Sequence, residues 1–192
     1  MTEPTPPLAK IQTQGVHHIT FNGADRRTSI DFWEGVLGMP FVFEQPNLDA
    51  ETVNHLYFDP GDGRLITVFT EEGRRTQGEV QDQIGSVHHV AFTLSLASWN
   101  HAVARLNERQ IPNSGPVDRG FMHSIYFREP CGQLLELSCY KFEPPEGSTH
   151  AEVLRIAHGH RVVRGAQNIE DIDLADAIQT IVARRGISLS SS

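Results

Sequence analysis

Two short segments of the chain each carry a pair of adjacent histidines inside an apolar, β-branched run. They are residues 15–21, with the sequence GVHHITF, and residues 86–92, with the sequence SVHHVAF. Residues of these types favour β-strands. If the two strands lie side by side, one imidazole from each can point into a shared cavity. Two imidazole nitrogens would then be available as ligands for a metal ion.

A carboxylate in an apolar strand is the third candidate ligand. Glu136 stands inside the run LLEL, where burial of a charge is costly unless it is paired or bound to a cation. Pairing with Arg119 or Arg128 is the simpler interpretation, but the two histidine strands favour a metal. Two imidazoles and one carboxylate are typical of non-haem Fe(II) enzymes, which keep open positions for substrate and dioxygen. Mn(II) suits the same ligands, and a catalytic zinc ion with bound water is a third option.

The choice between the two histidines of each pair stays open at this point. Neighbouring residues of a strand point to opposite faces, so at most one of each pair faces the metal squarely. His18 and His89, the second histidine of each pair, are expected to point to corresponding faces of their two strands. His17 and His88 are expected to point the other way, unless they lie at twisted strand ends beside the cavity.

The elements that must position these residues follow one order twice: strand, helix, strand, strand, strand. In the first half they are residues 15–21, a helix begun by Asp25 and ended by Gly38, and strands at 39–44, 54–59 and 64–70. In the second half they are residues 87–94, a helix that starts near Ser95 or Ser98, and strands at Val117, 123–128 and 133–140. The polar segment 71–83 is predicted to link the two halves.

Matching residues in the two halves indicate an internal repeat. The sequence HLYF at 55–58 corresponds to HSIYF at 123–127, and the same register aligns Thr67 with Glu136. The predicted fold class is therefore α+β. Two βαβββ modules, residues 13–70 and 85–142 of one domain at 13–142, form a curved mixed sheet around the metal site.

Both ends of the chain lie outside the repeat. Residues 1–12 are polar and proline-rich, and they are predicted to be disordered. Residues 143–192 are predicted to be a C-terminal helical extension, with helices at 151–156 and 172–182. This extension is expected to pack on the sheet or on a partner subunit.

The composition excludes several classes of function. Hydrophobic residues make up 39% and charged residues 21%, as in ordinary globular proteins. A net charge of −8 argues against nucleic acid or an anionic membrane as a partner. No apolar run is long enough to span a bilayer, and no signal-peptide pattern is present. Cys131 and Cys139 are expected to be free thiols of a cytoplasmic protein.

Four further histidines are weaker candidates for the site. His158 and His160 lie outside the repeat, without a carboxylate at a persuasive spacing, and are predicted to be surface residues. His55 and His123 can line the cavity, but neither belongs to the predicted ligand set.

The repeat, with histidine on the first strand of each module and glutamate on the last, resembles the vicinal oxygen chelate superfamily over residues 15–140. The stretches HHIT, HHVAF and SIYFREPCGQLLEL are most similar to its ring-cleaving extradiol dioxygenases, especially the branch that acts on hydroquinones. The resemblance implies that the second histidine of each pair binds the metal. The implied ligands are thus His18, His89 and Glu136.

The resemblance also implies catalytic roles for five other side chains. Tyr126 matches the active-site tyrosine of the family, and Arg119 matches its substrate-side arginine, which would stabilise negative charge. His17, Thr20 and His88 match positions beside the ligands that take part in proton transfer. His88 is the implied general base, and Tyr126 and His17 are the implied proton donors.

The function implied by the resemblance is an Fe(II)-dependent extradiol-type dioxygenase. It would cleave a catechol or hydroquinone-like diol with O2, as a homodimer, in aromatic compound degradation. A glyoxalase-type lyase or isomerase is one alternative, but that chemistry usually adds a fourth protein ligand, and the matching position holds Thr67. A metal-free small-molecule binding protein of the same fold is another. The hydroquinone enzymes are longer, with extra material between the two histidine strands and a different C-terminal region.

Overall fold

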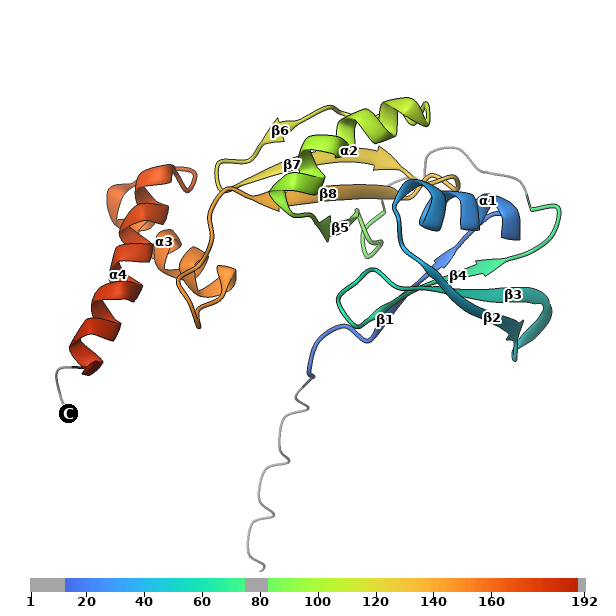
Figure 1. Ribbon diagram of the computed structural model, residues 1–192, viewed down its shortest axis with the longest axis horizontal. Coiled ribbons are helices and arrows are strands. Elements are labelled where there is room, and N and C mark those ends of the chain that lie inside the picture. The colour runs from blue at the N-terminus through green and yellow to red at the C-terminus, as the bar shows by residue number, and fades with distance from the viewer. Residues whose placement is uncertain (1–12, 75–82, 190–192) are drawn as a thin grey trace, which may run out of the picture. The chain divides into compact units, whose positions relative to one another are not determined.

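The computed structural model describes residues 13–74 and 83–189 (Figure 1). The predicted disordered segment 1–12 and most of the predicted linker therefore lie outside the described residues. The chain divides into two compact units, Met1–Thr76 and Gln77–Ser192, which we call the N-terminal unit and the C-terminal unit. Each unit contains one of the two predicted modules.

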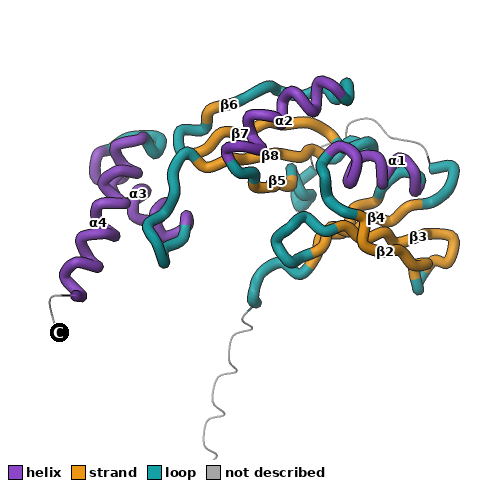
Figure 2. The backbone as a smooth tube through the Cα atoms, in the orientation of Figure 1, coloured by secondary structure: helices purple, strands orange, loops and turns teal. Residues whose placement is uncertain are grey.

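The N-terminal unit has the predicted order of elements. They are β1 (His18–Asn22), α1 (Arg26–Ile30), its π-helical continuation η1 (Asp31–Val36), β2 (Phe41–Asn47), β3 (Ala50–Phe58) and β4 (Leu65–Thr70). The four strands form one sheet in the order β1-β4-β3-β2, with β1 parallel to β4 and the other pairs antiparallel (Figure 2).

The helix of this unit begins and ends where its sequence predicts. The Asp25 carboxylate accepts a hydrogen bond from the Thr28 backbone N–H at 2.8 Å, and Gly38 adopts a φ of +69° just after the last turn. The buried face carries Trp33, whose ring centroid lies 4.9 Å from that of Phe21 on β1 and 6.3 Å from that of Phe58 on β3. An aromatic core thus fixes the helix against the sheet.

The C-terminal unit repeats this arrangement and adds two helices. Its elements are β5 (Val90–Thr93), α2 (Leu96–Glu108), β6 (Val117–Asp118), β7 (Met122–Arg128), β8 (Leu134–Tyr140), α3 (His150–Arg164) and α4 (Asp171–Leu189). The strand order is β5-β8-β7-β6, with β5 parallel to β8. Helix α2 lies over one face of this sheet (Figure 1) and buries Trp99, Ala102 and Leu106.

The structure thus has a mixed α+β fold with C-terminal helices, as predicted, and each module forms its own four-stranded sheet. The predicted strand ends were wrong at the histidine pairs. Strand β1 begins at His18 and β5 begins at Val90, so His17, His88 and His89 precede the strands. Each of these strands pairs with a single parallel neighbour, and the two ladders begin at the pairs His18–Leu65 and Val90–Leu135.

The two C-terminal helices are longer than predicted and pack against each other. Thr149 caps the start of helix α3, with its side chain accepting a hydrogen bond from the Glu152 N–H, and Gly165 caps its end in the left-handed conformation. The buried residues between the helices are Val153, Ala157, Leu174, Ala177 and Ile181, with Phe121 and Phe142 packed against them. The helical extension therefore packs on itself and on Phe121 and Phe142, which flank strands β7 and β8 of its own unit.

Within the described residues, no helix combines the length and apolar character needed to cross a bilayer. Cys131 and Cys139 are both free thiols, as predicted. His158, on α3, is exposed, and its Nδ1 accepts a hydrogen bond from Arg161 Nη2 at 3.2 Å.

Replacing Asp173 by asparagine is expected to lower the melting temperature at pH 7 by several degrees. The buried Asp173 carboxylate accepts hydrogen bonds from Arg164 Nε at 3.2 Å and Nη2 at 2.7 Å, and from the Glu170 N–H at 2.8 Å. The bonds from Arg164, followed by that from Glu170, hold the pKa of Asp173 below its ordinary value of 3.8. A lowered pKa stabilises the fold above the unfolded-state value and stops doing so as the pH falls through the folded-state value.

The melting temperatures of wild type and Asp173→Asn, followed by circular dichroism, should therefore converge as the pH is lowered below about 4. Glu170→Gln is the matched control, because Glu170 is exposed and pairs with the same guanidinium at 2.9 Å. Exposed ion pairs contribute little. An equal loss of stability in both variants would contradict the role given to Asp173.

Candidate metal centre

Two predicted ligands meet in the C-terminal unit. Glu136 lies in the middle of β8, opposite Tyr126 on β7 and Ala91 on β5, and its side chain is only 2% exposed. Its Oε2 lies 2.9 Å from Nε2 of His89, which stands immediately before β5. An imidazole nitrogen thus lies close to an oxygen of a buried carboxylate. This arrangement is suited to a divalent cation.

The neighbours of Glu136 keep its carboxylate ionised. Burial raises the pKa of this group, but hydrogen bonds from nearby hydroxyl groups and the charge of His89 outweigh burial and lower the pKa below its ordinary value. One of these bonds is donated by Ser138 Oγ to Oε1 at 2.8 Å. A metal ligand must be deprotonated, so this environment prepares Glu136 for a cation.

Tyr126 and Arg119, both implied by the family resemblance, lie beside this pair. The Tyr126 ring centroid is 5.9 Å from that of His89, edge to face. Arg119 Nη2 donates a hydrogen bond to Tyr126 Oη at 3.1 Å, and its guanidinium lies 5.2 Å from the centre of the tyrosine ring. Arg128, the other arginine considered for Glu136, donates from Nη1 to the Gly132 carbonyl at 2.7 Å.

The two histidine pairs have the same internal geometry. The Nδ1 atoms of His88 and His89 lie 2.7 Å apart with the rings nearly perpendicular, and those of His17 and His18 lie 2.9 Å apart. In each pair, the Nδ1–H of one ring donates a hydrogen bond to the Nδ1 of the other ring. Such a contact fixes the tautomer and ring orientation of a ligating histidine. In the C-terminal unit this leaves Nε2 of His89 directed at the Glu136 carboxylate.

The N-terminal unit holds the other predicted residues. His18 starts β1, and Thr20 follows on the same strand, where its Oγ1 accepts a hydrogen bond from Thr67 Oγ1 at 2.8 Å. Thr67 is fully buried opposite Thr20 and Tyr57. The position that corresponds to Glu136 thus carries a hydroxyl engaged with its neighbour, which is a poor metal ligand.

His55 and His123 have different surroundings. His55 on β3 shares a hydrogen bond between Nδ1 and Tyr57 Oη at 2.9 Å, and its ring packs 4.4 Å from Phe69. Burial, and secondarily the charge of nearby His18, lowers the pKa of His55. His123 instead stacks on Trp99 of α2, with ring centroids 5.8 Å apart, on the face of its sheet opposite Glu136.

Neither unit alone provides a complete ligand set. In residues 13–74 or 83–189, no three His, Cys, Asp or Glu side chains of one unit gather closely enough to hold a metal ion. His89 and Glu136, two of the three predicted ligands, form the pair that we call the two-ligand half-site. The third predicted ligand, His18, belongs to the other unit. Ser138 was not among the predicted site residues, although strand alternation places it on the same face as Glu136.

Comparison with known proteins assigns the family. The model of the Glyoxalase/Bleomycin resistance protein/Dioxygenase superfamily matches residues 15–137, and the chain belongs to this superfamily. The predicted resemblance is therefore confirmed.

Three similar proteins are named as dioxygenases. MhqO of Bacillus subtilis (strain 168), provisionally named a ring-cleaving dioxygenase, is 32% identical over 130 residues, or 66% of this chain and 40% of MhqO. Biphenyl-2,3-diol 1,2-dioxygenase 3 of Rhodococcus globerulus is 28% identical over 115 residues, or 59% of this chain and 57% of that enzyme. A crystal structure of a provisionally named dioxygenase from Bacillus subtilis subsp. subtilis str. 168 has a TM-score of 0.58 at 30% identity. The match covers 67% of this chain and 41% of that one.

The chain thus spans about two fifths of MhqO and less than three fifths of the biphenyl-diol enzyme. The matched part contains both histidine pairs and Glu136. The helices α3 and α4 lie beyond the residues that the family model matches.

Proposed function

We propose that this chain is an Fe(II)-dependent, extradiol-type dioxygenase that cleaves a catechol or hydroquinone-like ring with O2. The observation that carries the proposal is the buried contact between Glu136 Oε2 and His89 Nε2 at 2.9 Å, with Tyr126 beside it. Relatives named as ring-cleaving dioxygenases support the same class of reaction.

His18, His89 and Glu136 would hold the ion, and Mn(II) is compatible with the same donors. When bound, such an ion lowers the pKa of a coordinated hydroxyl group and brings the diol and dioxygen together. The residues of this chain would supply the binding, orientation and proton transfers around it. His17 and His88, through their Nδ1 contacts, would keep the two ligand imidazoles in position.

Proton transfer is assigned to three side chains. His88 would accept a diol proton, because imidazole is suited to this role near neutral pH. Tyr126 Oη would donate a proton during ring opening, and the Arg119 guanidinium at 3.1 Å would stabilise the resulting phenolate. His17 is the alternative donor.

Thr20 has a role in orientation. Its Oγ1 accepts from Thr67, so its own hydroxyl hydrogen is directed elsewhere and can be donated to substrate.

The proposal is tested by loading the chain with Fe(II) without oxygen and then adding air with catechol or hydroquinone. Oxygen consumption with a rise in visible absorbance is the expected result. Activity with Ni(II) or Zn(II) on a glutathione hemithioacetal, without oxygen uptake, would instead identify a lyase. The metal present in freshly purified protein is the independent check, and iron is expected.

Tyr126→Phe is expected to keep full iron stoichiometry and to lower kcat by roughly 10²-fold, because it removes the proton donor while His18, His89 and Glu136 are all retained. Oxygen consumption and metal analysis measure the two effects separately. Tyr57→Phe, at the corresponding position of the other module, is the control, and its hydroxyl contacts His55. An unchanged kcat in Tyr126→Phe would remove Tyr126 from the chemistry.

A further inference from the structure

Arg119 stands in a tight turn between β6 and β7, residues 118–122, which we call the arginine turn. The Arg119 N–H donates to the Met122 carbonyl at 2.9 Å and closes a two-residue hairpin loop. Gly120, the first residue of this loop, has a φ of +85°, and such loops require a positive φ there. Its N–H donates to Asp118 Oδ1 at 2.7 Å. The backbone of the turn thus sets the point from which the Arg119 side chain starts.

The arginine turn is weakly held by its own sheet. Strand β6 has two residues and lies at the edge of the sheet, and its ladder with β7 contains two residue pairs. A short edge hairpin of this kind opens easily by itself. Contacts from outside the sheet are therefore needed to hold the turn in one position.

The C-terminal extension contacts two consecutive residues of the turn. The Ile169 carbonyl oxygen, between α3 and α4, lies so close to Gly120 that a Cβ at this glycine would be 2.9 Å from it. Real Cβ atoms essentially never approach another atom this closely, so a larger residue would force one of the two backbones to shift. The Phe121 side chain packs on the buried residues between the two helices. The extension thus limits the movement of the turn.

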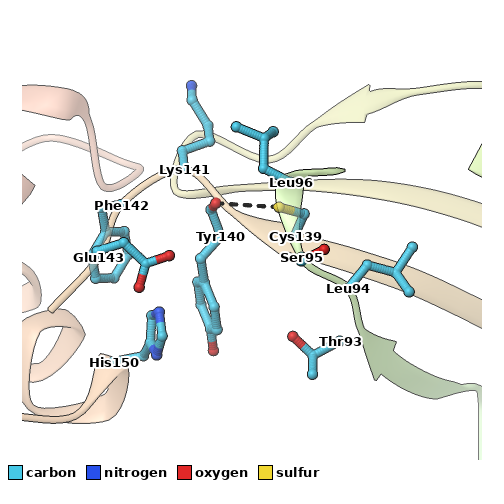
Figure 3. Close-up of a pocket in the computed structure, with 10 residues that line it drawn as sticks. All are labelled: Thr93, Leu94, Ser95, Leu96, Cys139, Tyr140, Lys141, Phe142, Glu143 and His150. Atoms are coloured by element: carbon cyan, nitrogen blue, oxygen red, sulfur yellow. Dashed lines mark hydrogen bonds between the residues drawn. The ribbon is translucent and has the colours of Figure 1, made fainter. Parts of the chain in front are cut away.

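Lys141, the residue after β8, connects the turn to α4. Its ammonium lies 3.2 Å from the Asp118 carboxylate and 3.8 Å from that of Asp171, the first residue of α4. The Lys141 N–H also donates to the Phe121 carbonyl at 3.1 Å. Figure 3 shows the Lys141 side chain directed away from the Tyr140 ring, where the chain leaves β8 for the extension. One residue thus contacts the turn and the start of α4.

Arg119 reaches the two-ligand half-site from this turn. Its Nη2 donates to Tyr126 Oη at 3.1 Å. Met122, at the other end of the turn, lines the cavity of about 310 Å³ beside His89 and Glu136. An arginine side chain has many rotamers, so its bond to one acceptor depends on a fixed backbone.

We propose that the C-terminal extension positions Arg119 for its bond to Tyr126 by holding the arginine turn. Gly120, Phe121 and Lys141 are the positioning residues. The helices α3 and α4 lie beyond the residues that the family model matches, so the extension adds this role to the superfamily domain. The consequence for ring cleavage rests on the proposed function. The position of Arg119 does not, and it can be measured without a metal.

Gly120→Ala tests the contact with the extension, and Gly61→Ala is its matched control. Gly61 has a φ of +91° and donates to Asp59 Oδ1 at 2.7 Å, but no described atom outside its chain neighbours lies within 4 Å of a Cβ built there. Both variants thus carry the same backbone strain, and only Gly120→Ala displaces the turn. In the metal-free chain, nuclear Overhauser effects between the Arg119 δ protons and the Tyr126 ring are expected in wild type and control. They should be lost in Gly120→Ala, and their retention would overturn the proposal.

A double-mutant cycle measures the consequence for the reaction. In the Fe(II)-loaded chain, Gly120→Ala is expected to lower kcat for catechol about tenfold, because a small misplacement near the reacting groups is costly. In the Arg119→Ala background the same change should have no further effect. An equal loss of kcat in both backgrounds would overturn the proposal, because the effect would then not pass through Arg119.

Two variants of Lys141 decide the case in which Gly120→Ala does not fold. Lys141→Gln should weaken the Overhauser effects and lower kcat about threefold, the scale of one partly exposed ion pair, whereas Lys141→Arg should retain both. Unchanged Overhauser effects in Lys141→Gln would in that case overturn the proposal. Oxygen consumption separates the two proposals. A wild type that takes up no oxygen would refute the dioxygenase, and the Overhauser effects in the metal-free chain would still decide the position of Arg119.

Discussion

Replacing Glu136 by alanine is expected to abolish the binding of Fe(II) during anaerobic loading, and with it all ring cleavage. The variant removes the only carboxylate of the proposed ligand set, and two imidazoles alone hold Fe(II) weakly. Iron content after anaerobic loading and desalting is the direct measurement, and oxygen consumption with catechol is the second. A full iron stoichiometry in the variant would exclude Glu136 as a ligand.

A stability measurement separates this role from a structural one. Removal of this hydrogen-bonded carboxylate is expected to lower the metal-free melting temperature by several degrees. Loss of iron in a variant that circular dichroism shows to be folded at the assay temperature assigns the ligand role to Glu136. Glu108→Gln is the matched control, because Glu108 is an exposed carboxylate paired only 3.1 Å from Arg105 at the end of α2. This variant should keep both the iron and the activity.

The repeat could be predicted because local signals agree with the fold in both modules. Asp25 and Ser95 cap the two helices as their residue types suggest, and the strand order follows from the spacing of apolar runs. The strand ends could not be predicted. The length of a parallel pair depends on where its neighbour begins, and β4 and β8 start only at Leu65 and Leu134.

Some residues of the candidate site could be predicted from the sequence, and others could not. Glu136 stands out because a charge interrupts an apolar strand, and His89 stands out because its pair is repeated at His18. The stacking of His150 on Tyr140 was not predictable. His150 meets Tyr140 because the helix that it starts packs against Phe142 and against α4, which lies far from Tyr140 in the sequence. No local residue pattern encodes such a contact.

Trp33→Ala is expected to destabilise the N-terminal unit by about 3–5 kcal/mol, because a large buried side chain is lost and a cavity remains. Trp33 is 1% exposed and contacts the rings of Phe21, Phe32 and Phe58. The chain has two compact units, so a single unfolding midpoint would not report on one of them. Hydrogen exchange followed by mass spectrometry resolves the effect, which should be largest in β1 and β3.

Trp99→Ala makes the corresponding change in the C-terminal unit and should cost less. Trp99 is 7% exposed, and its ring stacks on His123 rather than within an aromatic cluster. Leu48→Ala, at a side chain that is 91% exposed, should stay within about 0.5 kcal/mol of wild type. Unchanged exchange in β1 of Trp33→Ala would show that the aromatic cluster does not hold the strand bearing His18. The expected rise in the exchange rate would show that the position of His18, the predicted third ligand, depends on the aromatic core of the N-terminal unit.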